Sequence, residues 1–132
     1  MKWRLISVLT ACLGLLGCAE DPRKDSMSDT LRLYERSIKW GEYSDAQLLT
    51  TQPATQAQLE EYENIKVISY EVVQHEMSDD LNEIRQVVEI KFFHNTQGII
   101  KTLRDHQVWN YDDERKVWEL QSGLPDFMAV FR

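Results

Sequence analysis

The sequence predicts an α+β domain in which N-terminal helices pack on a four-stranded antiparallel meander. The first observation is a change of period at Asn64, since apolar residues recur every three or four positions before it and every second position after it. The second is the later half of the chain, where β-branched and aromatic residues predominate. The third is the shortness of the links between the predicted strands, at 78–82, 95–98 and 112–115. Short links rich in turn-forming residues join strands as hairpins, so consecutive strands are expected to be neighbours in one sheet.

Three helices are predicted before Asn64. The first, over about 27–40, begins at a Ser-x-x-Asp start signal and carries apolar residues at spacings of four, three and four, at Met27, Leu31, Tyr34 and Ile38. Gly41 is expected to end it. A second start signal follows at Ser44, and Pro53 at a first-turn position opens a third helix that runs to about Tyr62.

Four strands follow, at about 65–76, 84–94, 99–111 and 116–121. Symmetric pairing about the three turns predicts the cross-strand pairs Tyr70–Ile90, Ile90–Leu103, Val72–Val88 and Trp109–Trp118. One face then collects a core for the helices to cover, made of Ile68, Tyr70, Val72, Val88, Ile90, Phe92, Leu103, Trp109, Trp118 and Leu120. The opposite face receives the hydrated side chains Glu71, Glu89, Lys91, Thr102 and Arg104.

Polar residues interrupt the predicted inner face. The register places Gln74, Gln86 and Gln107 side by side in one row, with Asp105 one row away. Buried polar groups without partners are costly, so this row must meet water, a helix end or a ligand. One interpretation is a row that bonds the helix ends or lies at the wet rim of the sheet. The other is the mouth of a pocket between sheet and helices, lined by Tyr70, Asp105, Gln107, Trp109 and Trp118.

The sequence contains no signature of a cofactor, a metal site or a catalytic centre. His75, His94 and His106 do not stand at metal-ligand spacings with one another or with a Cys or Asp on the same face. The run 112–114 is acidic but lacks the alternating ligands and the Gly of a calcium loop. A phosphate-binding loop and a nucleophile elbow are also missing from the sequence. We therefore assign no catalytic residue, no metal ligand and no cofactor.

The N-terminus begins with Lys2 and Arg4 and continues with an apolar run from Leu5 to Leu16. A basic start, about a dozen apolar residues and a small residue after them are the parts of a secretory signal. The run is shorter than the about 20 apolar residues that span a bilayer. These features predict a cleaved export signal.

Within this segment, Leu15-Leu16-Gly17-Cys18 resembles the lipobox of bacterial lipoproteins. The resemblance implies cleavage between Gly17 and Cys18 and attachment of three acyl chains, of the palmitate type, to Cys18. Three chains hold a protein on a membrane far more firmly than one. In such lipoproteins an Asp directly after the Cys retains the protein in the inner membrane, and here that position is Ala19. The resemblance thus implies the periplasmic leaflet of the outer membrane.

The chain then divides into a signal peptide over 1–17, a lipidated Cys with a tether over 18–26, and one domain over 27–132. Loss of the signal removes two basic residues and leaves 115 residues with a net charge of about −9. An acidic surface argues against nucleic acid and against electrostatic docking on anionic lipid. The apolar tail, Phe127–Phe131, is expected to dock on the domain or to serve as a partner-binding peptide.

The order of helix, Gly break, short helices and curved meander over about 27–127 resembles the NTF2-like or cystatin-like fold. The segments most similar to it are Tyr34–Tyr43, Gln107–Tyr111 and the strand of Trp118. The chain is also similar to small NTF2-like lipoproteins of proteobacteria. Enzymatic relatives such as ketosteroid isomerase use a carboxylate base with a Tyr and a protonated acid. That likeness implies a base at Asp105 and a Tyr partner at Tyr70 only by analogy of position.

Three hypotheses follow for the function. The first is a non-enzymatic module, held on the membrane by its lipid anchor, that binds an envelope protein or a small apolar ligand. The second is a small isomerase or hydrolase of the ketosteroid-isomerase type that uses Asp105 and Tyr70. The third is a homodimer joined through the outer face of the sheet, at Val67, Phe93 and Ile100.

Overall fold

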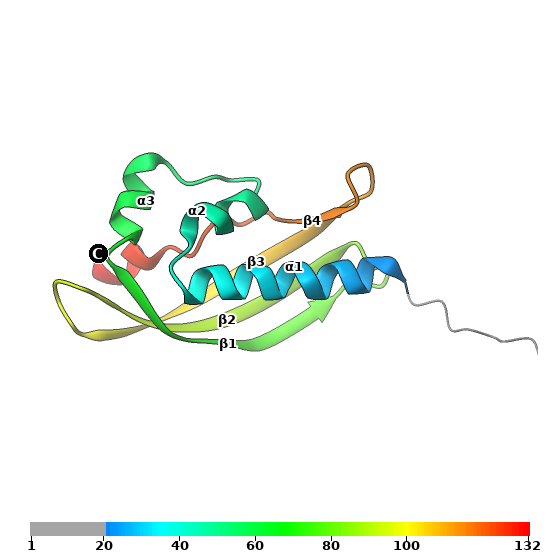
Figure 1. Ribbon diagram of the computed structural model, residues 1–132. Coiled ribbons are helices and arrows are strands. Elements are labelled where there is room, and N and C mark those ends of the chain that lie inside the picture. Colours follow the sequence, from blue (N-terminus) through cyan, green and yellow to red (C-terminus); the bar gives the residue numbers. More distant parts are fainter. Residues whose placement is uncertain (1–20) are drawn as a thin grey trace, which may run out of the picture.

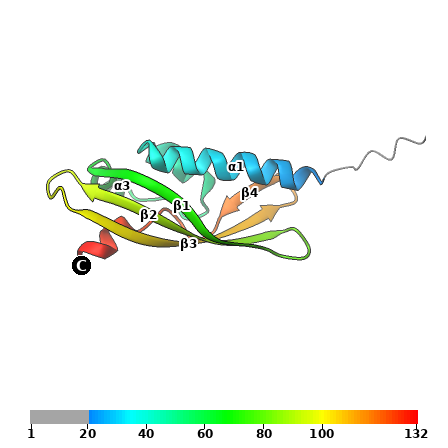
Figure 2. The same ribbon diagram turned by 90° about the horizontal axis from the view of Figure 1, so that it is seen from below.

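The computed structural model describes residues 21–132, so Gly17 and Cys18 lie outside the described residues. Helices lie on one side of a curved four-stranded sheet, and α1 runs lengthwise over it (Figures 1 and 2). Within 21–132, no helix is long and apolar enough to cross a membrane. The elements in chain order are α1 (Pro22–Lys39), α2 (Tyr43–Ala46), η1 (Gln47–Leu49), α3 (Gln56–Tyr62), β1 (Ile65–Met77), β2 (Glu83–His94), β3 (Ile100–Asp112), β4 (Val117–Leu120) and η2 (Phe127–Phe131).

Helix α1 begins at Pro22, five residues before the predicted start. The carboxylate of Asp21 caps it by accepting a hydrogen bond from the backbone N–H of Arg23 at 3.0 Å. Proline suits the first turn, because its missing N–H would have no partner inside the helix. The tether predicted over 18–26 is therefore helical from Pro22 onward. The other end agrees with the prediction, since Gly41 follows the helix with a φ of 70°.

Helix α3 starts at Gln56, three residues after the predicted proline. The Thr55 hydroxyl accepts from the backbone N–H of Gln58 at 3.2 Å, and the Gln58 side chain accepts from the backbone N–H of Thr55 at 2.9 Å. This reciprocal capping satisfies two N–H groups that the helix leaves free. The cap therefore sets the start of the helix in place of Pro53.

The sheet is an antiparallel meander in the order β1-β2-β3-β4, as the short links predict. The predicted pairs Tyr70–Ile90, Val72–Val88 and Ile90–Leu103 are confirmed. Six of the ten residues predicted for the inner face are buried, namely Val88, Ile90, Phe92, Trp109, Trp118 and Leu120. Two others, Ile68 and Val72, are 49% and 46% exposed, because they lie on β1 at the open edge of the sheet.

Strand β1 contains two register shifts, at Ile68 and at Val73. Each inserts one extra residue, so the side chains beyond it change faces relative to a regular strand. Beyond Val73, His75 rather than Gln74 pairs with Gln86, and the predicted glutamine row is wrong at that position. Before Ile68, Val67 pairs with Phe92 and packs on the core. The predicted outer-face patch therefore loses Val67 and keeps Phe93 and Ile100.

The predicted pair Trp109–Trp118 is also wrong. Trp109 pairs with Leu120 and Trp118 pairs with Tyr111, because the turn lies one residue further along the chain than predicted, over 113–116. Lys116 adopts a φ of 55° in that turn. A shift of two residues leaves every side chain on its face, so both tryptophans are still buried on the inner face.

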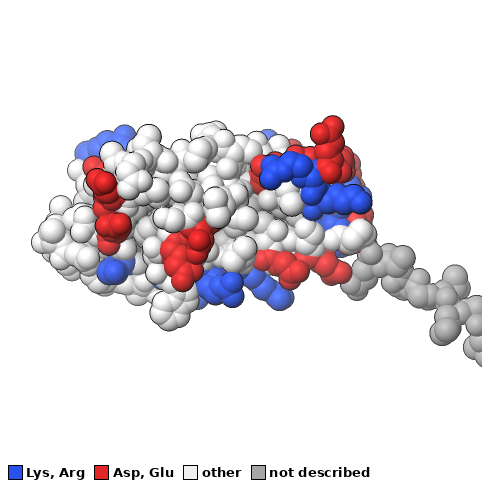
Figure 3. Space-filling view, turned by 45° about the horizontal axis from the view of Figure 1, so that its top comes forward, with Lys and Arg blue, Asp and Glu red and all other residues white. Residues whose placement is uncertain are grey.

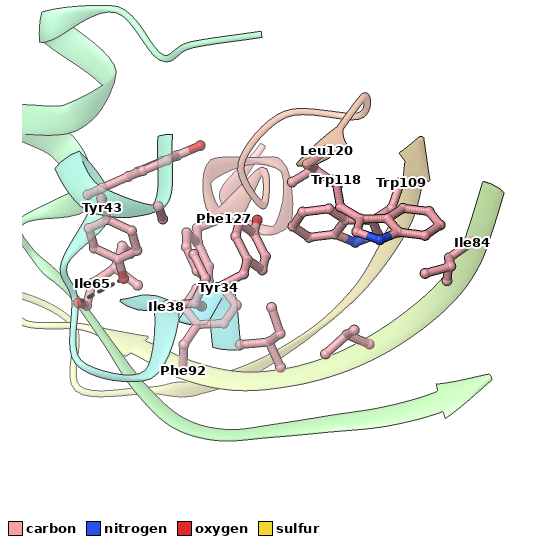
Figure 4. Packing of buried hydrophobic residues seen from close by; sticks show 14 residues of the cluster. Tyr34, Ile38, Tyr43, Ile65, Ile84, Phe92, Trp109, Trp118, Leu120 and Phe127 are labelled. Carbon is pink, nitrogen blue, oxygen red and sulfur yellow. Dashed lines mark hydrogen bonds between the residues drawn. The ribbon is translucent and has the colours of Figure 1, made fainter. Parts of the chain in front are cut away.

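The core is rich in aromatic side chains that meet edge to face (Figure 4). The Tyr34 ring of α1 packs on Trp109 with centroids 5.1 Å apart. Phe127 is fully buried, and its ring lies 4.9 Å from that of Phe92 and 5.4 Å from that of Tyr62. The C-terminal segment is therefore docked as part of the core.

Candidate functional site

The polar row on the inner face is centred on Gln107 of β3. This side chain is 1% exposed, and its oxygen Oε1 accepts from Gln86 Nε2 at 2.7 Å and from Trp109 Nε1 at 3.1 Å. An indole nitrogen is a donor only. Trp109 therefore fixes the orientation of the Gln107 amide, with its oxygen toward the tryptophan and its NH₂ group on the other side.

That NH₂ group binds two of the residues predicted for the site. Gln107 Nε2 donates to Asp105 Oδ2 at 2.8 Å and to the Tyr70 hydroxyl at 3.1 Å. Both protons and both lone pairs of the Gln107 amide are thereby used. The structure thus joins Tyr70, Asp105, Gln107 and Trp109, four of the five residues predicted to line a pocket, in one hydrogen-bond network.

The network ends at His75 on the edge strand. Because Gln86 uses its NH₂ group on Gln107, its oxygen faces His75, whose Nδ1 lies 3.1 Å away. A hydrogen bond to that oxygen requires the proton of the neutral imidazole to be on Nδ1. The sequence did not reveal this role, because the extra residue at Val73 is what brings His75 to the inner face.

Asp105 is a buried carboxyl group with 9% of its surface exposed. Burial raises the pKa of Asp105 from an ordinary 3.8 to about 6, against the smaller lowering effects of the Gln107 hydrogen bond and of His106. None of the ion pairs found within 21–132 includes it. Gln107 is also its only side-chain partner among those residues, through Oδ2. Its other oxygen, Oδ1, has no hydrogen-bond partner among these residues and is not one of their fully buried unpartnered atoms, so it remains accessible to a further molecule.

Two hydroxyl groups on the sheet-facing side of α1 are buried without a hydrogen-bond partner among residues 21–132. They belong to Tyr34, which is fully buried, and to Ser37, which is 1% exposed. Burial raises the pKa of Tyr34 well above its usual value, and the nearby charge of Asp105 raises it further. Tyr34 therefore lies within the electrostatic reach of Asp105. The sequence pattern identified Tyr34 as a core residue, and no sequence signal marks an unpartnered hydroxyl.

Tyr70 completes the group from the edge strand. Burial raises the pKa of its phenol, while the hydrogen bond from Gln107 lowers it and the charge of Asp105 raises it again. Its oxygen accepts from Gln107, so its own proton is available to donate elsewhere. In the described chain, Gln107 thus joins Asp105 to Tyr70, and the unpartnered hydroxyl of Tyr34 is coupled to Asp105 through the field of its charge. We call Asp105, Tyr34 and Tyr70 the Asp105 site.

Trp118, the fifth predicted residue, lies outside this network. Its indole N–H donates to the backbone oxygen of Arg23 at 3.0 Å, and its ring lies 5.3 Å from that of Tyr111. It therefore joins β4 to the first turn of α1. The prediction grouped Trp118 with the pocket because alternation along a strand indicates the face of the sheet on which a residue lies. It does not indicate the distance of that residue from Asp105.

A hollow of about 580 Å³ is lined by residues 74–76, 85–87 and 106–108, which include His75, Gln86 and Gln107 of the network. No residue of α1 lines it, and its outward-facing lining residues are Gln74, Glu76, Arg85, Val87, His106 and Val108. This hollow excludes Tyr70 and Asp105. Across 21–132, no group of three His, Cys, Asp or Glu side chains is arranged to hold a metal ion.

Charged side chains are unevenly spread over the surface. In the space-filling view, acidic and basic groups lie together near the start of α1, and a mostly uncharged area lies above an acidic patch near the centre of the view (Figure 3). The sequence accounts for part of this, because residues 46–59 carry no charge. The net charge of the whole chain is −7.

No protein-family model matches the chain, and no curated protein matches it in sequence. Among solved structures, it is similar to a protein from Exiguobacterium sibiricum 255-15 described as a Ca/calmodulin-dependent kinase II association domain. The TM-score is 0.60 at 12% identity, over 80% of this chain and 92% of that one. An epoxide hydrolase/cyclase-like enzyme of pyran ring formation in the polyether salinomycin gives a TM-score of 0.48 at 12% identity, over 80% and 94%. The first of these likenesses shows the NTF2-like α+β fold, and a fold alone does not assign a function.

Proposed function

We propose that this protein is a non-enzymatic, lipid-anchored module of the cell envelope that binds a small, largely apolar ligand at the Asp105 site. The observation that carries the proposal is the fully buried Tyr34 hydroxyl, which has no hydrogen-bond partner among residues 21–132. A buried polar atom of this kind calls for a partner from outside residues 21–132, such as a ligand group or an ordered water molecule.

Further atoms of the site support the same proposal. Asp105 keeps Oδ1 uncommitted, and Tyr70 keeps its phenolic proton. The row that contains Asp105 continues through Val88 to Val72, so apolar side chains adjoin the polar atoms. A few polar groups beside apolar walls are what small-ligand sites offer.

The anchor is proposed from the lipobox-like stretch that ends at Cys18. Only residues 19–21 separate Cys18 from the start of α1 at Pro22. A chain of that length reaches at most about 14 Å. The domain would therefore sit close to the membrane surface, with the first turn of α1 as its nearest helix. Ala19 supports placement in the periplasmic leaflet of the outer membrane.

Native mass spectrometry of the full-length chain, purified from cell envelopes in a mild non-ionic detergent, tests the binding proposal. We expect a small molecule to be retained by the parent protein and lost from the double variant Tyr34→Phe and Asp105→Asn. Tyr111→Phe is the matched control, because this partly buried tyrosine lies outside the network. If the parent protein retains no small molecule but binds one specific envelope protein, the ligand proposal is wrong and the partner is a protein.

The second candidate is a pocket enzyme of the ketosteroid-isomerase type with Asp105 as base and Tyr70 as donor. One observation favours it: burial brings the pKa of Asp105 to about 6, within the range useful to a general base near neutral pH. Isomerisation of a β,γ-unsaturated cyclic ketone by the purified chain separates the two functions. A turnover that Asp105→Asn removes would support the enzyme, whereas binding without turnover would support the module.

A further inference from the structure

We infer that the ligand of the Asp105 site is a protonated amine on an apolar body, with its ammonium group beside Asp105. This rests on the proposed function, because it names the ligand class for the same site. The ammonium group would supply the positive charge that Asp105 does not find among residues 21–132.

The first step is the missing counter-charge. A carboxylate taken out of water is normally paired with a cation, because an unpaired buried charge is strongly unfavourable. The titratable groups whose fields couple to Asp105 are Tyr34 of α1, Tyr62 of α3, Tyr70 of β1 and the adjacent His106 of β3. The three tyrosines are neutral at physiological pH. The register places His106 on the outer face, opposite Val87 and on the other side of the sheet from Asp105.

The second step is the kind of hydrogen bond that the site still offers. Both N–H groups of Gln107 are committed, one to Asp105 and one to Tyr70. The site therefore offers a newcomer the acceptor Oδ1 of Asp105 and the hydroxyl groups of Tyr34 and Tyr70, which can donate or accept. An ammonium group carries three donors and no acceptor, which matches a site of this type. A carboxylate ligand could accept from the two hydroxyl groups, but it would face the charge of Asp105 with no cation to compensate for it.

The third step is the surroundings of the charge. Val88 lies beside Asp105 in the sheet, and Val72 continues the row to the open edge with 46% of its surface exposed. These valines suit an apolar body attached to the ammonium group. The net charge of −7 also favours the approach of a cation over an anion.

Isothermal titration of the full-length chain in non-ionic detergent with three ligands of one shape tests the inference. The probes are cyclohexylmethylamine, cyclohexylmethanol and cyclohexanecarboxylate. At pH 7.5 we expect the amine to bind at least about tenfold more tightly than the other two. Lowering the pH to 4.5 protonates Asp105, so the affinity for the amine should fall by about tenfold or more. Asp105→Asn should abolish the preference at pH 7.5, whereas Glu71→Gln, an exposed acid on β1, should keep it.

A second readout covers the event that Asp105→Asn fails to fold. In ¹³C NMR of the parent protein, saturating amine should move the titration of the Asp105 carboxyl to lower pH, because the cation stabilises its ionised form. If the alcohol binds as tightly as the amine or more tightly, and binds still more tightly at pH 4.5, the ligand is not an amine. The Asp105 site would then bind a neutral ligand. The inference of an amine ligand would also be wrong if no probe binds and the titration of Asp105 does not move. If native mass spectrometry also finds no retained molecule, the proposed site fails with it.

Discussion

Trp118 donates its indole N–H to the backbone oxygen of Arg23 at 3.0 Å, although 95 residues separate them in the chain. The Arg23 side chain continues the connection, since its Nη1 donates to Asn82 Oδ1 at 2.9 Å and to the backbone oxygen of Asp80 at 3.2 Å. The first turn of α1 is thus held by β4 and by the turn between β1 and β2. The end of the domain nearest to the proposed anchor is therefore built into the fold.

Cys18→Ala is expected to abolish lipid attachment. Without a thiol at this position no acyl chain can be attached through sulfur, so the protein should lose alkyne-palmitate labelling and leave the membrane fraction. Cys12→Ala is the control, because Cys12 lies within the apolar run and should be dispensable for labelling. Continued labelling of the Cys18→Ala protein would refute the lipobox interpretation.

Tyr34→Phe is expected to leave the ligand-free protein as stable as the parent, or more stable by about 1 kcal/mol. The substitution removes a buried hydroxyl that has no partner within 21–132, and with it the penalty of its desolvation. Tyr62→Phe should have the opposite effect and cost about 1 kcal/mol, because that hydroxyl donates to the backbone oxygen of Pro125 at 2.8 Å. Urea unfolding of the three proteins measures the difference. A clear loss for Tyr34→Phe would mean that a trapped water molecule already satisfies its hydroxyl.

Asp105→Asn is expected to change how the free energy of unfolding depends on pH. The folded-state pKa is raised from 3.8 to about 6, so the folded protein binds the extra proton between these values. The contribution of Asp105 to stability therefore falls as the pH rises from about 4 to about 6, by about 3 kcal/mol in total. The Asn variant should lack this fall and exceed the parent in stability at pH 8. A difference between the two proteins that stays constant from pH 4 to pH 8 would contradict the burial of the ionised group.

Gln107→Leu is expected to destabilise the protein by about 2–4 kcal/mol, since Trp109 Nε1 and Gln86 Nε2 lose the oxygen that they share. The same change should raise the pKa of Asp105 further, because the hydrogen bond from Gln107 lowers it. Gln74→Leu is the control and should change the stability by less than about 0.5 kcal/mol, because Gln74 is exposed on the outer face. Urea unfolding measures the first effect, and ¹³C NMR of Asp105 measures the second.

The centre of the sheet could be predicted because alternation and turn position both act locally. Tyr70, Ile90 and Leu103 pair as the turns require. The register shifts at Ile68 and Val73 could not be predicted, because neither position carries a local signal for an extra residue such as a glycine. The early start of α1 was within reach of the sequence, since Asp21 before Pro22 is a cap followed by a first-turn proline.

The candidate site also contains residues that the sequence predicts and residues that it does not. Gln86, Gln107 and Asp105 were found because polar residues at inward positions break the apolar alternation of their strands. Tyr34 was counted as core, because its ring fits the helical period and its hydroxyl adds no pattern. His75 was missed because its face depends on the register shift at Val73. Sequence patterns therefore revealed which strands meet at the site, but not which hydroxyl groups lack partners.

The extra residue at Val73 determines how the length of β1 can change. Its neighbours Val72 and Gln74 pair with the consecutive residues Val88 and Val87, so Val73 has no position of its own in the ladder. Deleting it would leave His75 opposite Gln86 and remove only the bend. The strand can therefore gain or lose a residue here without exchanging the chemical groups on its two faces. Related chains with and without this residue should be aligned by their cross-strand partners. An alignment without a gap here would match an inward side chain of one chain to an outward side chain of the other.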